Sequence, residues 1–408
     1  MKNKTFLLIF AISLCNVFNS SAQEKKTIAP TLINLNYEDL LRNREDLRKG
    51  KPETAEAFNK IIKKADKILS TEPLKVTDGA VPPTGDIHDF FTIGKYSWKN
   101  TETKDGLPYI RKDGATNPES QGDNYDMNRY GKTVSYVNQL SLAWFFSEDE
   151  KYAKKAAEIL RVWFINPQTR MNPNFECASA LPGKFNGMPI GIIFGAQLVK
   201  MIDNVNILSM SNNWTKEDNN SLKKWFDDYS AWLLMSDYGV IEGKATNNHG
   251  TWYSAQVAAC AIYNGRLELA KSMIEKGKTQ LNQQVAKDGS LPRELDRKQS
   301  FNYSIYGLSA FCTLAGCANA VGEDLWNYQT TDGRGIKLAF NFLIPYIVDG
   351  KKWEWETLTD AKGTEAVDII TQAARALGTE DLKRAEKFIN ATSPLESDKV
   401  WLLGRNKK

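Results

Sequence analysis

Only two histidines occur in the 408 residues, and one of them lies in the stretch Asn247–Tyr253, which reads NNHGTWY. Neighbouring amides and an imidazole, as at Asn248 and His249, can donate hydrogen bonds to an anion. Trp252 and Tyr253, which follow directly, have flat faces on which a sugar ring can rest. This combination of residue types is typical of an active site, and we predict one here.

The second histidine, His88, lies among prolines, a glycine and aspartates in residues 82–91, a composition that predicts a loop. It belongs to the first of two long stretches without helical periodicity, residues 75–126 and 166–188, which are rich in Gly, Pro, Asn and aromatic residues. Long loops in a compact domain often form lids or binding surfaces. We therefore predict that His88 and Tyr96 contact a substrate; the alternative is that they only pack the loop onto helix ends.

Two arginines and a tyrosine complete the first set of candidates. Arg129 can bind a carboxylate through two parallel hydrogen bonds. Arg297 and Tyr303 lie within one short stretch, where a guanidinium can polarise a phenol. Each has a plain alternative, because an arginine is usually a solvated charge and a tyrosine is often a core residue. Asn247 or Asn248 could likewise serve as the N-cap of the helix that follows.

Outside the two long loops, apolar residues recur at helical spacing along almost the whole chain. Short turns at 264–265 and 287–289 separate neighbouring helical patterns, which favours antiparallel hairpins. The chain is long for a single core, but a ring of hairpins can grow because each pair packs mainly on its neighbours. We predict an all-α, single-domain protein with helices at 134–146, 150–164, 190–205, 216–235, 251–263, 267–285, 304–321 and 336–348.

The first 22 residues have the charged start, apolar middle and small-residue end of a secretory signal peptide. We predict cleavage after Ala22, a mature domain over residues 23–408, and a periplasmic or secreted location. No later stretch is long and uncharged enough to predict a membrane span.

The charge balance and the cysteines exclude several classes of partner. Loss of Lys2 and Lys4 with the signal peptide leaves 51 basic against 49 acidic residues, and no dense Lys/Arg block predicts nucleic-acid binding. The cysteines at 177, 260, 312 and 317 lack the spacing of a metal site and are expected to be buried thiols. No acidic cluster with ligand spacing surrounds His249, so we predict no metal and no cofactor.

Five stretches follow one another in a characteristic order. They are 88–91 (HDFF), 106–119 (GLPYIRKDGATNPE), 169–174 (TRMNPN), 247–253 (NNHGTWY) and 292–304 (PRELDRKQSFNYS). Read together, from about residue 80 to about residue 350, they resemble the alginate lyase family and its glucuronan-cleaving relatives among the helical polysaccharide lyases. The resemblance implies an (α/α) toroid, an incomplete barrel of antiparallel helical hairpins around a deep cleft.

The resemblance also implies an exported polysaccharide lyase that cleaves a uronic-acid polymer, alginate ahead of glucuronan, by β-elimination. Carried over to this sequence, the implied catalytic residues are Asn248, His249, Arg297 and Tyr303. Tyr306, one helical turn further on, is the rival of Tyr303 because it can share the same helix face.

Elimination in a uronate starts with removal of the C5 proton beside a carboxylate, whose charge must first be neutralised. Asn248 as an amide donor is our first choice for this role, ahead of a protonated Glu242 or the cationic Arg297. In mannuronate or glucuronate the C5 proton and O4 lie on the same side of the ring, so Tyr303 can act as both base and acid. In guluronate they lie on opposite faces, and His249 becomes the natural base.

The chain departs from the alginate-specific pattern at two places, and these leave the polymer open. Residues 184–187 read KFNG where we expect a Gly-Arg-Gly type of turn, and Asn302 stands where some alginate lyases have a histidine. Two other functions compete. A glycoside hydrolase needs two opposed carboxylic acids, for which Asp86 with Asp89 or Glu294 with Asp296 are available. A non-catalytic glycan-binding protein would not need the acid–base residues at all.

Overall fold

The computed structural model of the protein describes residues 29–358 and 366–392. The expected signal peptide, residues 1–22, lies outside the described residues. The helices are α1 (Tyr37–Arg48), α2 (Pro52–Leu69), α3 (Asp126–Ser147), α4 (Glu150–Leu160), α5 (Ala196–Leu208), α6 (Lys216–Met235), α7 (Asp237–Glu242), α8 (Asn248–Tyr263), α9 (Leu267–Gln284), α10 (Pro292–Leu295), α11 (Ser300–Ala320), α12 (Ile336–Val348), α13 (Val367–Leu377) and α14 (Glu380–Thr392).

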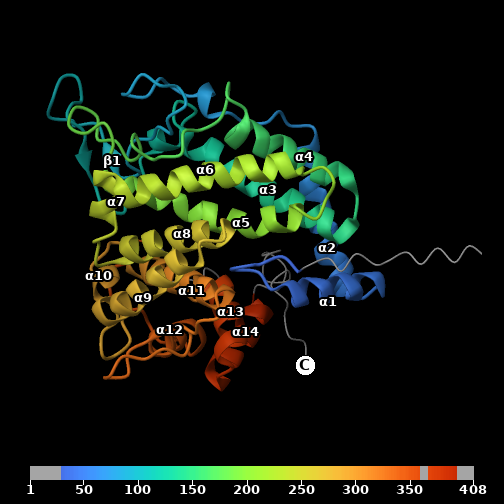
Figure 1. Cartoon of the computed structure of the whole chain (residues 1–408). Coiled ribbons are helices and arrows are strands. Elements are labelled where there is room, and N and C mark those ends of the chain that lie inside the picture. The colour runs from blue at the N-terminus through green and yellow to red at the C-terminus, as the bar shows by residue number, and fades with distance from the viewer. Residues whose placement is uncertain (1–28, 359–365, 393–408) are drawn as a thin grey trace, which may run out of the picture.

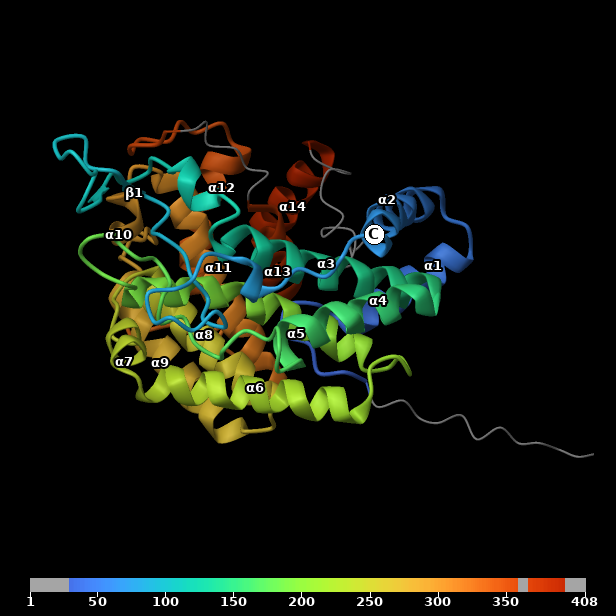
Figure 2. The same ribbon diagram turned by 90° about the horizontal axis from the view of Figure 1, so that it is seen from above.

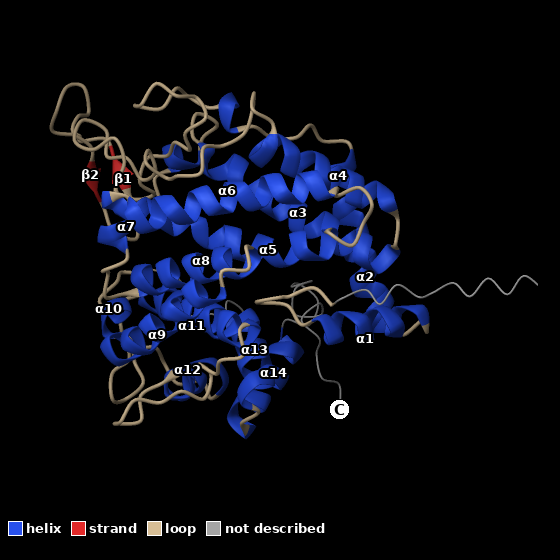
Figure 3. Cartoon of the chain, in the orientation of Figure 1, coloured by secondary structure: helices blue, strands red, loops and turns tan. Residues whose placement is uncertain are grey.

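The helices pack as hairpins joined to one another side by side. Helix α3 packs on α4 and α5, α8 packs on α9 and α11, and α13 packs on α14. The described residues contain one sheet, in which the short strands β1 (Ser97–Trp98) and β2 (Ile110–Arg111) pair antiparallel. Figures 1 and 2 show the loops of this sheet together with α7 and α10 at one end of the molecule, and α1 and α2 at the other. In Figure 3 the chain is otherwise almost entirely helical.

Helices α8 and α11 form the inner part of the fold. Every residue of α8 except His249 is buried, so this helix has no solvent face and departs from the usual amphipathic pattern. Close approach of the backbone is one reason: a Cβ atom on Gly250 would lie 2.0 Å from the carbonyl oxygen of Ala245. Because protein surrounds α8 along its length, only one of its ends can border a cleft.

Several helix boundaries differ from those that periodicity predicts, and three of them concern α8, α11 and the start of α5. Helix α8 begins at Asn248 rather than at 251, because Asn247 caps it with its side-chain oxygen. Helix α11 begins at Ser300 rather than at 304, which places Tyr303 inside the first turn. Residues Pro189–Gly195 form a 3₁₀ segment before α5, where periodicity predicts a helix from residue 190. In the first two cases the polar first turn carries no apolar pattern, so the periodicity misses it.

The four cysteines of the described part are buried and free, as predicted. One apolar helical stretch, Pro189–Leu208, has the length and composition of a membrane span, but 67% of that window is buried inside the protein. Burial of this kind is what a core helix shows, so the stretch is weak evidence for a span.

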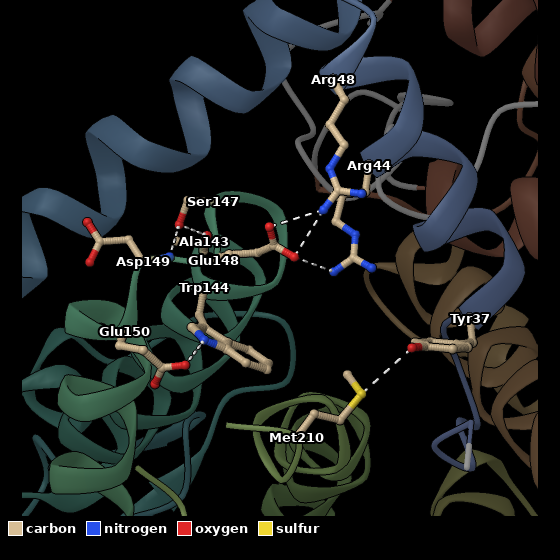
Figure 4. Close-up of polar contacts among 10 residues, drawn as sticks. All are labelled: Tyr37, Arg44, Arg48, Ala143, Trp144, Ser147, Glu148, Asp149, Glu150 and Met210. Carbon is tan, nitrogen blue, oxygen red and sulfur yellow. Dashed lines mark hydrogen bonds and ion pairs between the residues drawn. The ribbon is translucent and has the colours of Figure 1, made fainter. Parts of the chain in front are cut away.

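At the end opposite the loops, α1 is tied to the corner between α3 and α4 by three residues, Arg44, Arg48 and Glu148, which we call the α1 clamp (Figure 4). Glu148 ends α3 in the left-handed conformation, with φ of 58°. Its carboxylate accepts a hydrogen bond from Arg44 at 3.4 Å and two from Arg48 at 3.0 and 3.1 Å. Tyr37 of α1 also contacts the sulfur of Met210, at 3.7 Å.

Candidate active site

A cavity of about 1070 Å³ opens at the end of the molecule where the two long loops meet the first turns of α8 and α11. It is lined by residues from both loops, from α7 and from those first turns. Of the residues singled out from the sequence, the cavity lining contains Tyr96, Glu242, Asn248, His249, Arg297, Tyr303 and Tyr306.

His249 lies in the first turn of α8 and is held by a carboxylate of α7. The side-chain oxygen of Asn247 caps the helix by accepting the backbone N–H of His249 at 3.2 Å. The ring Nδ1 lies 2.5 Å from Oε1 of Glu242, which is almost fully buried. When Nδ1 carries the proton of this pair, Nε2 is the ring nitrogen that can accept a proton. Glu242 therefore orients the imidazole.

Asn248 is held by a second carboxylate, that of Glu294 in α10. The two oxygens of Glu294 accept the backbone N–H and the side-chain Nδ2–H of Asn248, each at 2.8 Å. Burial raises the pKa of Glu294, and the hydrogen bonds from Asn248 partly offset this rise. The amide of Asn248 keeps a second hydrogen on Nδ2. That hydrogen remains available for an anion in the cavity.

Arg297 and Tyr303 form the third group, and both are positioned from the first long loop. The guanidinium of Arg297 donates to both oxygens of Asp113, at 2.7 and 3.2 Å, and its central carbon lies 3.7 Å from the centre of the Tyr303 ring. The hydroxyls of Tyr303 and Tyr96 are 3.0 Å apart. Burial is the main reason why the pKa of Tyr96 is raised, and the hydrogen bond to Tyr303 raises it further. Tyr96 is thus a neutral partner for the Tyr303 oxygen.

Tyr306 lies one turn beyond Tyr303 in α11. Its ring packs against Trp252, with centroids 5.2 Å apart, and burial raises its pKa. Arg297 lies over the ring of Tyr303, which favours Tyr303 over Tyr306 as the group that exchanges protons.

The family model for alginate lyase matches residues 76–353. The chain belongs to the alginate lyase family. A crystal structure of an alginate lyase from Bacteroides ovatus is 33% identical, with a TM-score of 0.86, and the match covers 92% of this chain and 99% of that one. The alginate lyase of Pseudomonas syringae pv. syringae is 32% identical over 150 residues, which is 36% of this chain and 39% of the Pseudomonas protein. The sequence match thus spans well under half of that relative.

A structure of alginate lyase A1-III complexed with a tetrasaccharide shares the fold, at 15% identity and a TM-score of 0.60 over 94% of this chain and 98% of that one. The helical hairpins of the present chain therefore form the (α/α) toroid predicted from the sequence.

In this member of the alginate lyase family, two residues that were predicted to contact a sugar lie in the core. Trp252 is 1% exposed and Tyr253 is 5% exposed, and the hydroxyl of Tyr253 donates to the carbonyl of Leu233 at 2.8 Å. The prediction that they contact a sugar is wrong, because α8 is buried on all sides and only its first turn reaches the cavity.

Two residues predicted to contact substrate lie outside the cavity lining; for Arg129 the prediction is wrong, and for His88 it stays a prediction. The ring Nδ1 of His88 lies 2.7 Å from the carbonyl of Arg170, and His88 is not part of the cavity lining. Arg129 is buried, donates to Asp126 at 2.7 and 3.2 Å, and also bonds the carbonyl of Asp123. Both side chains hold loop segments in place, because their polar atoms bond protein groups outside the cavity.

The sequence did not reveal two of the three carboxylates that position the site, nor most of its cations. Asp113 and Glu294 were visible in the family-like stretches, but not as partners of Arg297 and Asn248. The cavity lining contains Lys95, Arg111, Lys244 and Arg297, against one carboxylate, that of Glu242. A cavity with this balance favours a polyanion.

The alternative function, glycoside hydrolysis, requires two opposed carboxylic acids, and the cavity lining contains no such pair. Asp86 and Asp89 lie outside it and accept hydrogen bonds from Asn172, at 2.9 and 2.8 Å. Glu294 is occupied by Asn248. Among the described residues, no group of three or more His, Cys, Asp or Glu side chains could hold a metal ion.

Proposed function

We propose that the protein is an exported polysaccharide lyase that cleaves alginate, polymannuronate ahead of glucuronan, by β-elimination. The observation that carries this proposal is the contact of Arg297 with the Tyr303 ring, at 3.7 Å, in a cavity that also contains Asn248 and His249. Membership of the alginate lyase family supports the same reaction class.

The first step is neutralisation of the uronate carboxylate. The second N–H of Asn248 donates to it, and the cations of the cavity lower the energy of the negative charge that develops as C5 loses its proton. Glu294 serves this step indirectly, because it fixes the direction of the Asn248 amide.

Tyr303 then performs both proton transfers. As the phenolate it takes the proton from C5, the C4–C5 double bond forms, and the C4–O4 bond breaks. The same hydroxyl returns the proton to the departing O4, so Tyr303 is regenerated as the phenolate. Arg297 above the ring and the hydroxyl of Tyr96 at 3.0 Å both stabilise the negative oxygen.

His249 orients substrate in this scheme. Its Nε2 could act as a base on guluronate, where the C5 proton lies on the other face, but we assign it a secondary role. The Arg297–Tyr303 contact places cation and phenol together, as the single-tyrosine mechanism requires.

The test is a panel of pure polymannuronate, polyguluronate and polyglucuronate, with product formation followed by ultraviolet absorbance of the new conjugated double bond. We expect absorbance to rise fastest on polymannuronate and not at all with the Tyr303→Phe variant. New reducing ends without absorbance would identify a hydrolase and overturn the proposal.

The proposed chemistry uses no metal ion. Carboxylate neutralisation comes from Asn248 and from arginine or lysine side chains. We expect full activity after dialysis against a chelator. Loss of activity that a divalent cation restores would contradict this.

We also propose a periplasmic or secreted location, because the first 22 residues have the composition of a signal peptide. Terminal sequencing of the protein recovered from cell fractions tests this, and we expect a chain that begins at Gln23 outside the cytoplasm. Full-length chain in the cytoplasm alone would refute it.

A further inference from the structure

A tight turn at residues 181–187 presents an aromatic side chain to the cavity. Leu181 and Phe185 exchange two backbone hydrogen bonds of 2.9 Å, and Gly183 between them has φ of 79°. A Cβ atom on Gly183 would lie 3.0 Å from the Cα of Pro108, so the turn packs directly on the first long loop. At its other end, Tyr238 donates to the carbonyl of Gly187 at 2.8 Å. The turn is therefore held at both ends.

Phe185 is 47% exposed although it belongs to the cavity lining. Ile241 of α7, which is 56% exposed, lines the same cavity. Leaving apolar side chains in water is unfavourable, because apolar surface is more stable when it is removed from water. A rigid turn that keeps a phenylalanine exposed inside a binding cavity indicates a ligand that covers it.

The neighbour of Phe185 adds a charge. The ammonium of Lys184 lies 5.3 Å from the centre of the Phe185 ring. A uronate unit has both an apolar C–H face and a carboxylate, so it can rest on the aromatic ring and pair with the ammonium at once. A neutral sugar could use only the ring.

The volume of the cavity leaves room for such a unit in addition to the one that reacts. At about 1070 Å³ it reaches the upper end of the range, about 300–1,000 Å³, that sites for drug-sized ligands occupy. The groups of the candidate active site come from the first long loop, from α7, α8, α10 and α11, and from the link between α10 and α11, whereas Phe185 comes from the second long loop.

We propose that Phe185 and Lys184 form a binding subsite for a uronate unit of the chain other than the one whose C5 proton is removed. This inference rests on the proposed function, because it assumes that the cavity binds a polyuronate. It makes residues 184–185 determinants of the preference for acidic over neutral chains and for long over short ones.

The kinetic experiment compares Phe185→Ala, Phe185→Trp and Lys184→Ala on oligomannuronates of increasing length. For chains long enough to reach the turn, we expect Phe185→Ala to raise KM about tenfold, with kcat unchanged, and Phe185→Trp to retain the wild-type KM. The shortest oligomer that is cleaved should show no difference. Lys184→Ala should raise KM at low salt only, because added salt screens the ion pair. Phe388→Ala, on α14 and 39% exposed in the wild type, is the matched control.

A binding experiment separates this proposal from the proposed function. Migration of each variant, in the Tyr303→Phe background, is measured in native gels that contain polymannuronate or a neutral glucan. We expect polymannuronate to retard Phe388→Ala more than Phe185→Ala, and the glucan to retard neither. Equal retardation of the two variants by polymannuronate overturns the subsite. Unequal retardation, together with a wild type that forms no ultraviolet-absorbing product, overturns the lyase reaction and supports the subsite.

Discussion

The two ends of this molecule use the same kind of contact in different surroundings. At the loop end, the side chains of Glu242 and His249 are 4% and 17% exposed. At the opposite end, the side chains of Arg48 and Glu148 in the α1 clamp are 53% and 60% exposed. Water screens the clamp strongly, so its pairs contribute about 0–1 kcal/mol each. Removing one partner of a buried pair instead leaves the other group without compensation.

This difference in exposure indicates the role of the carboxylates in the active site. Glu242, Glu294 and Asp113 each hold a different candidate side chain, and each holds it through a contact of 2.5–2.8 Å. These contacts fix direction, which matters when a group must meet a substrate atom. The clamp fixes only where α1 lies, a requirement that a looser contact also satisfies.

The largest effect is expected from Tyr303→Phe, which removes one hydroxyl and keeps the ring beneath Arg297. Because the same oxygen removes and returns the proton, turnover should fall by about 10³-fold or more while substrate binding stays near wild type. Rates from ultraviolet absorbance and binding of polymannuronate by calorimetry check both parts. Substantial activity in this variant, with loss in Tyr306→Phe, would reassign the role to Tyr306.

The next effect concerns His249 and its buried partner Glu242. His249→Ala should slow cleavage of polymannuronate by about 10²-fold, because the substrate loses an orienting partner, without making guluronate the preferred substrate. Product analysis on pure polymers checks this. If the wild type cleaves guluronate bonds and the variant loses that activity alone, His249 is the base and the single-tyrosine mechanism is incorrect.

A smaller effect is expected at Asp113, the most exposed of the three site carboxylates. Asp113→Asn weakens the hold on Arg297 and should lower kcat about tenfold at neutral pH. Asp332→Asn is a matched control, because the pairs Arg297–Asp113 and Arg334–Asp332 have the same side-chain exposures, 20% and 34%. Equal kcat values for the two variants would show that Asp113 does not position Arg297.

The contact between Asp113 and Arg297 also predicts how the stability of the protein depends on pH. The hydrogen bond from Arg297 is the main reason why the pKa of Asp113 lies below its ordinary value. A lowered carboxyl pKa means that the contact stabilises the fold above the ordinary aspartate pKa and is lost as the pH falls through the lower value. Asp113→Asn should therefore show a shallower loss of stability on acidification than the wild type, as measured by denaturant unfolding.

Much of the fold could be predicted because apolar periodicity marks the buried faces of most helices. Periodicity could not tell how many sides of a helix are buried, which is why Trp252 and Tyr253 were expected at a surface. The first turns of α8 and α11 are rich in polar residues and too short to show an apolar repeat, so they were missed as helix.

The candidate site was predictable to the extent that its residues lie in local motifs. Asn248, His249, Arg297 and Tyr303 do meet at one cavity, although their roles stay predictions. The partner Asp113 is 184 residues from Arg297, and no spacing rule connects residues at that separation. The prediction for Arg129 was wrong for a different reason: its partner Asp126 is only three residues away, but the two side chains are one helical turn apart only because α3 begins at Asp126.

The smallest effect is expected in the α1 clamp, and its sign separates the two kinds of contact. Glu148 adopts a left-handed conformation, with φ of 58°, that costs a residue with a side chain about 1 kcal/mol and glycine almost nothing. Glu148→Gly loses the pairs with Arg44 and Arg48, together worth roughly 0.5 kcal/mol after solvent screening. The gain exceeds the loss, so Glu148→Gly should raise the free energy of unfolding by about 0.5 kcal/mol, whereas Glu148→Ala, which keeps the strain, should lower it. Denaturant unfolding of both variants, with cleavage rates that stay at the wild-type level, checks this. A lower stability for Glu148→Gly than for the wild type would mean that the exposed pairs outweigh the backbone strain.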